Sequence, residues 1–152
     1  MLKYIIVYLQ FVIASCNCNH AQETGSSNNK PDFITITQDT LITYDIKGIS
    51  TEGAGAKVNY VSGKITKSVT SIYGETGQAT IIYEFDTDKI KVLETKYSYK
   101  TTIENIKSEK DMKLEYKISY IIDFKGNLIG KEIPKRIDVF KEFKEAVPFE
   151  LK

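Results

Sequence analysis

Strict alternation of apolar and polar residues in the second half of the chain predicts β-strands. In residues 112–124 the apolar positions are Met112, Leu114, Tyr116, Ile118, Tyr120, Ile122 and Phe124. A period of two is typical of an antiparallel strand that buries one face. Residues 78–86 repeat the pattern, and the positions expected to face the core are Ala79, Ile81, Tyr83 and Phe85.

Turn residues divide the rest of the chain into further short strands. Ser62-Gly63 separates strand patterns at 56–61 and 64–73, which is typical of a two-residue hairpin. Turns are also predicted at 73–78, 86–89 and 124–128, and one or two strands are expected within 33–46. In the strand that begins at Ile90, we expect the inward positions to shift from Ile90 and Val92 to Leu93, Tyr97 and Tyr99. A shift of one residue predicts a bulge or a twisted edge.

The end of the chain changes to a helical period. Ile137, Phe140, Phe143 and Val147 form one apolar stripe, Pro134 suits a first helical turn and Pro148 a stop. The predicted fold is therefore mainly β (α+β), an antiparallel β-meander of about six to eight strands with one C-terminal helix. We expect the helix to pack on the sheet, in preference to a membrane or a partner, because its polar face mixes Lys and Glu.

The first residues have the pattern of an exported protein. Lys3 precedes an apolar run of about eleven residues, too short for the roughly 20 that cross a bilayer as a helix. The run ends in Ile13-Ala14-Ser15-Cys16, which resembles the lipobox of bacterial lipoproteins. The resemblance implies that residues 1–15 are a signal peptide and that Cys16 is lipidated and becomes the first residue. It also implies secretion across the inner membrane and anchoring at the outer membrane or cell surface.

A polar stretch separates this cysteine from the strand patterns. Residues 16–31 contain Gly, Ser and Asn and few residues to bury, so we expect a flexible tether. The single β-rich domain is then expected at 32–152. Cys18 and His20, the remaining cysteine and the only histidine, both lie in this tether.

The net charge and the types of side chain in the expected domain argue against several classes of function. Without residues 1–15 the chain holds 20 basic and 20 acidic residues and a single arginine, Arg136. A neutral domain poor in arginine is not expected to bind nucleic acid. The expected domain has no histidine for nucleophilic catalysis or for a metal site, so we predict no catalytic residue, no metal and no cofactor. Four acids near turns keep a carboxylate mechanism open: Glu75, Glu84, Asp86 and Asp88.

A second resemblance covers about 35 residues of the expected domain. The matched residues are Glu52-Gly53, Tyr60, Gly63-Lys64-Ile65, Tyr73-Gly74-Glu75-Thr76-Gly77 and Tyr83-Glu84-Phe85. They resemble a group of secreted bacterial proteins of uncharacterised function with a YGETG-type β-meander. The resemblance implies a sheet topology and no activity.

Tyrosine is the remaining candidate for function. The chain has ten tyrosines and no tryptophan, and Tyr97 and Tyr99 lie between Lys96 and Lys100. Such a strip is suited to contact a glycan or a peptide, although half-buried tyrosines are also ordinary in sheets. The sequence thus favours a non-enzymatic envelope lipoprotein, bound to the membrane by its lipid anchor, with an envelope protein or polymer as partner. The alternatives are a small carboxylate-based hydrolase of envelope glycan or peptide and a carrier of an apolar ligand.

Overall fold

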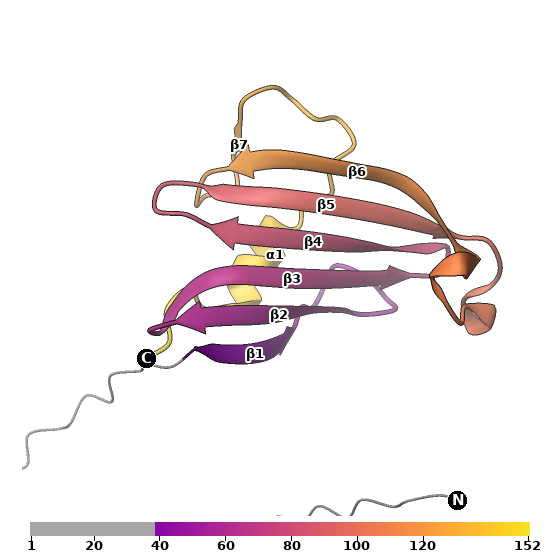
Figure 1. Cartoon of the computed structure of the whole chain (residues 1–152), viewed down its shortest axis with the longest axis horizontal. Helices are drawn as coiled ribbons and strands as arrows, with labels where there is room; N and C mark the ends of the chain where they lie inside the picture. The colour runs from indigo at the N-terminus through magenta and orange to yellow at the C-terminus, as the bar shows by residue number, and fades with distance from the viewer. Residues whose placement is uncertain (1–38) are drawn as a thin grey trace, which may run out of the picture. The chain divides into compact units, whose positions relative to one another are not determined.

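The described part of the chain folds into one open antiparallel sheet with a short helix on one face (Figure 1). The computed structural model describes residues 39–152. Their elements are β1 (Thr40–Asp45), β2 (Ala54–Val61), β3 (Lys64–Gly74), β4 (Gly77–Phe85), β5 (Ile90–Tyr99), β6 (Met112–Ile122), β7 (Leu128–Ile129) and α1 (Phe140–Ala146). Two 3₁₀ turns, η1 (Ile103–Asn105) and η2 (Glu109–Asp111), join β5 to β6.

The strands lie in the sheet in the order of the chain, β1 to β7, so the predicted meander with one C-terminal helix is confirmed. Short turns make this order possible. Ser62 and Gly63 both have positive φ, at 51° and 78°, as the favoured two-residue hairpin turn requires. The predicted signal peptide at 1–15, the predicted lipidation site Cys16 and the expected tether at 16–31 lie outside the described residues.

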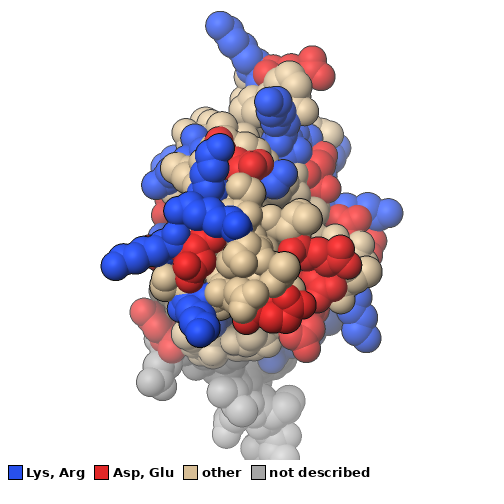
Figure 2. Space-filling model, turned by 90° about the vertical axis from the view of Figure 1, so that its right-hand side faces the viewer, with Lys and Arg blue, Asp and Glu red and all other residues tan. Residues whose placement is uncertain are grey.

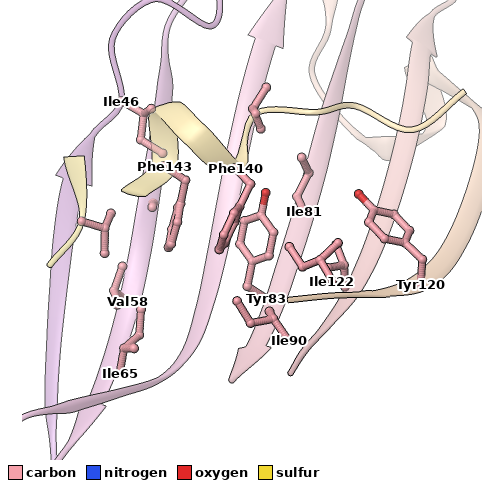
Figure 3. Packing of buried hydrophobic residues seen from close by; sticks show 14 of the residues in the cluster. Ile46, Val58, Ile65, Ile81, Tyr83, Ile90, Tyr120, Ile122, Phe140 and Phe143 are labelled. Carbon is pink, nitrogen blue, oxygen red and sulfur yellow. The ribbon is translucent and has the colours of Figure 1, made fainter. Parts of the chain in front are cut away.

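One face of the sheet, here called the inner face, carries the core. Phe140 and Phe143 of α1 point at the strands and pack on Tyr83, with ring centroids 5.4 Å and 4.9 Å from the Tyr83 ring (Figure 3). Tyr83 and Phe143 are almost completely buried. This burial raises the pKa of the Tyr83 hydroxyl strongly.

The helix is shorter than the sequence pattern predicted, because it begins at Phe140 and not near Pro134. The Ile137 N–H instead donates to the carboxylate of Glu94 on β5, and Arg136 N–H closes a turn onto the Ile133 carbonyl. These bonds hold the preceding residues out of the helical conformation. The apolar stripe is nevertheless correct, since Phe140, Phe143 and Val147 are buried.

Two of the predicted strand patterns are wrong at one point each. β5 keeps its alternation without a shift, so Glu94 is the inward residue, and Leu93, Tyr97 and Tyr99 lie on the opposite face. The irregularity is in β6, where Glu115 is the extra residue: Lys96 pairs with Tyr116, and Tyr97 pairs with Leu114. Leu114 therefore shares a face with Tyr97 and is 51% exposed, although alternation had placed it in the core.

Two buried hydroxyls of β3 offer a test of the inner face. Ser68 Oγ and Thr70 Oγ1 are fully buried and make no hydrogen bond within the described part of the chain. A buried hydroxyl without a partner costs roughly 1–3 kcal/mol. Thr70→Val keeps the shape of the side chain, so we expect it to raise the free energy of unfolding by about 1 kcal/mol.

The measurement is urea unfolding of the purified chain. Thr87→Val is the control, because Thr87 is exposed in the turn after β4, and its effect should stay within about 0.5 kcal/mol. A loss of stability in Thr70→Val would mean that its hydroxyl has a bonded partner.

Candidate binding surface

The two candidate tyrosines, Tyr97 and Tyr99, lie at one end of the sheet. Tyr97 on β5 pairs with Gln78 on β4, which pairs in turn with Tyr73 on β3. On its other side Tyr97 pairs with Leu114 on β6. Tyr73 and Leu114 are 46% and 51% exposed. Together with Tyr99 these side chains form what we call the tyrosine end, which lies on the face opposite α1.

Glycine at position 77 allows the strands to meet closely here. A Cβ at Gly77 would collide with the carbonyl oxygen of Tyr97 on the neighbouring strand. The Tyr99 N–H donates to the Thr76 carbonyl across 2.9 Å, so the end of β5 is joined to the β3–β4 turn. This turn is the YGETG segment, and its second glycine therefore helps to position Tyr97 and Tyr99.

The loop before β2 brings a glutamate to the same place. Ser50 donates its hydroxyl hydrogen to the Tyr73 carbonyl, and the Tyr73 N–H donates to the Gly53 carbonyl across 3.0 Å. Glu52 is held between these two bonds. Desolvation by burial is the largest cause that raises the pKa of the Tyr99 hydroxyl, and the nearby Tyr73 and Glu52 raise it further.

A groove beside Tyr99 is predominantly acidic. Its charged lining residues are Glu52, Glu75, Glu104 and Lys100. Lys100 is held by η2, because its ammonium donates to the Lys110 carbonyl across 2.8 Å. Figure 2 looks onto this end of the sheet, where acidic side chains gather on the right, basic ones on the left and uncharged surface between them. The groove therefore suits a ligand that carries positive charge and offers a flat or apolar group to Tyr99.

The four acids expected from the sequence do not meet in one cleft. Glu75 lies in the turn before the nine-residue strand β4, whereas Glu84 lies near the far end of β4, and Asp86 and Asp88 follow it. Glu84 contacts Lys67 at 2.9 Å, and Asp86 lies 3.7 Å from Lys91. A hydrogen bond from the Thr87 N–H, and then the charge of Lys91, hold the pKa of Asp86 below its usual value. These acids are exposed members of turns and surface ion pairs.

A buried carboxylate that sequence analysis missed lies under the loop before α1. Glu94 is 0% exposed, and Tyr116 and Tyr120 donate to its two oxygens across 2.7 Å and 3.0 Å. The Ile137 N–H lies 3.0 Å from both oxygens. Desolvation, together with Glu94, raises the pKa values of both tyrosines. With its oxygens occupied and no exposed surface, Glu94 serves as an anchor for the loop and is not placed to receive a substrate.

Neither a metal site nor a membrane-spanning helix is found among the described residues. Within 39–152, no group of three His, Cys, Asp or Glu side chains could hold a metal ion. No helix in this part of the chain has the length and apolar character needed to cross a membrane.

Comparison with known proteins adds nothing further, since no family model, curated protein or solved structure matches the chain.

The anchoring role of Glu94 gives a direct prediction. Glu94→Ala leaves two hydroxyls and one N–H without their shared acceptor, and we expect a loss of about 3 kcal/mol in unfolding free energy. The exchange of the Ile137 amide hydrogen should accelerate far more than that of strand amides at the opposite edge, such as Val58. Glu84→Ala, on an exposed ion pair of the same sheet, should cost less than about 1 kcal/mol. Unchanged protection of Ile137 in Glu94→Ala would contradict the anchor.

Proposed function

We propose that the protein is a lipid-anchored lipoprotein of a bacterial envelope whose domain is a non-enzymatic binding module. Its lipid is attached at Cys16, and residues 16–31 hold the domain away from the membrane. The proposal for the anchor rests on the Ile13-Ala14-Ser15-Cys16 motif. Two or three acyl chains suffice for stable attachment, whereas one chain binds only marginally.

The partner is an envelope protein or polymer that binds at the tyrosine end through a positively charged segment. The observation that carries this proposal is the groove in which Tyr99 is surrounded by Glu52, Glu75 and Glu104. An aromatic ring among carboxylates attracts amino or guanidino groups and packs against the carbon atoms that bear them. The scattered positions of the exposed acids give no comparable support to a hydrolase.

The anchor is tested by replacement of the cysteine. Cys16→Ala should prevent both lipidation and the cleavage that follows it, so the protein should keep residues 1–15. Mass spectrometry of the wild-type chain should find acyl groups at residue 16, and Cys18→Ala should be processed as the wild type is. An unmodified thiol at residue 16 in the wild type would end the proposal of a lipoprotein.

The binding surface is tested by cross-linking in the native envelope. The double variant Tyr97→Ala with Tyr99→Ala should lose most of its partner capture, because it removes the aromatic contacts and leaves the inner-face core intact. Capture by the wild type should also weaken as salt rises, since the glutamates are exposed.

Ile129→Ala is the matched control, because Ile129 is 50% exposed on β7 and does not line the groove. Equal capture by the double variant and the control would reject the tyrosine end as the binding surface. The enzyme would be favoured instead if the domain turned over an envelope glycan or peptide and replacement of one of the exposed acids abolished that turnover.

A further inference from the structure

The face opposite α1, here called the outer face, is organised in rows across the strands. Among the described residues no helix or loop packs over its centre, and α1 lies behind the strands in Figure 1. Residues paired between neighbouring strands share a face, so the register defines the rows. Three rows cross six strands: Asp45–Gly55–Ser71–Thr80–Thr95–Lys117, Thr43–Lys57–Val69–Ile82–Leu93–Ser119 and Leu41–Asn59–Lys67–Glu84–Lys91–Ile121.

This face has the anatomy of a protein interface. Val69, Ile82 and Leu93 are half-buried neighbours at its centre. Lys57 lies beside Val69, and the other charged residues of the rows lie in the two outer rows. An apolar centre inside a polar rim is typical of a stable protein contact. At strand spacings of about 4.8 Å and about 7 Å of strand for each row, the three rows of six strands cover roughly 600 Å², so a pair of such faces buries about 1,200 Å², the low end of the range for a specific interface.

We propose that the occupant is a second copy of the chain, packed outer face to outer face about a two-fold axis that runs along the strands between β3 and β4. Such an axis sets each strand against a different strand of the partner: β3 against β4, β2 against β5 and β1 against β6. Two sheets packed in this way stack about 10 Å apart with their strands within about 30° of each other.

The rows are self-complementary at the two central strands under this operation. In the central positions Val69 meets Ile82 of the other copy, Ser71 meets Thr80, and Lys67 meets Glu84. Apolar side chains thus meet apolar ones, hydroxyls meet hydroxyls, and opposite charges meet. Each of these contacts occurs twice, as a two-fold axis requires.

The two edges of the face also match. Asp45 on β1 meets Lys117 on β6 of the other copy, and Leu41, which is 67% exposed, meets Ile121. A twist between the sheets displaces these edge residues by about one row, a distance that the long side chain of Lys117 can span. Opposite charge at the two edges fixes which strands face each other.

The dimer leaves the proposed binding groove accessible. An axis along the strands puts the tyrosine ends of both copies at the same end of the pair, with the acidic grooves outside the stacked rows. The inference therefore goes beyond the proposed ligand site and does not depend on it. A paired arrangement would present two grooves to one partner.

A pair of cysteines tests the geometry in the full chain, with Cys18→Ala in every variant. Asp45 and Lys117 of one copy are five strands apart, about 24 Å, so a short bis-maleimide cannot join them within a chain. The double variant Asp45→Cys with Lys117→Cys should be linked into covalent dimers in the native envelope. Each single variant should remain unlinked, because equivalent residues of the two copies are also about 24 Å apart.

Charge reversal tests the same contact without a cross-linker. In the full chain purified in detergent, Lys117→Asp or Asp45→Lys alone should weaken dimerisation on the order of tenfold, and the two together should restore it. Ile82→Lys should give monomers that keep the circular dichroism of the wild type.

Monomeric wild type, or linking of the single cysteine variants as strong as that of the double, would overturn the dimer. Partner capture that needs Tyr99 and survives Ile82→Lys would show that the proposed function stands without it.

Discussion

The hydrogen bonds between Glu94 and the loop before α1 are the constraint on which the rest of the structure depends. A helix of seven residues is too short to be stable by its own hydrogen bonds, so its position must come from its flanks. Glu94 fixes the flank before it through the Ile137 N–H. The flank after it is fixed by Tyr60, whose hydroxyl donates to the Pro148 carbonyl across 2.7 Å, and by the Ile65 N–H, which donates to the Phe149 carbonyl. Between these two attachments Phe143 is held against Tyr83, and the inner face is closed.

Closing one face in this way leaves the other face without a covering element among the described residues. A single sheet has two faces, and the helix, the loop before it and the last residues all pack on one of them. The outer face accordingly keeps exposed apolar side chains such as Tyr73, Leu114 and Ile129. Scattered exposed apolar residues are ordinary, but aligned rows across several strands are typical of a contact surface.

The sequence predicts the fold correctly where the pattern is local and incorrectly where a tertiary contact decides the conformation. The turn at Ser62-Gly63 and the strand at 78–86 follow from turn chemistry and period two, so both were predictable. Glu94 was missed because an acidic side chain is not expected at a core position. The glutamate in the inward row was therefore interpreted as a shift of the alternation. Strict alternation from Ile90 would have placed it in the core. The partners that make its burial tolerable, Tyr116 and Ile137, lie 22 and 43 residues away and leave no local signal.

The candidate site was predictable in part for the same reason. Tyr97 and Tyr99 could be named from composition, but their neighbours could not, because Leu114 reaches the outer face only through the bulge at Glu115.

The same bulge affects how the sheet can associate. Most of β6 is an open edge, since β7 pairs only with Ile121 and Ile122. A bulge together with the charges of Lys113 and Lys117 discourages the addition of another strand at such an edge. Association through this edge of the sheet is thereby disfavoured, and the outer face, where Val69, Ile82 and Leu93 lie side by side at the centre, is the surface that offers apolar area for a contact.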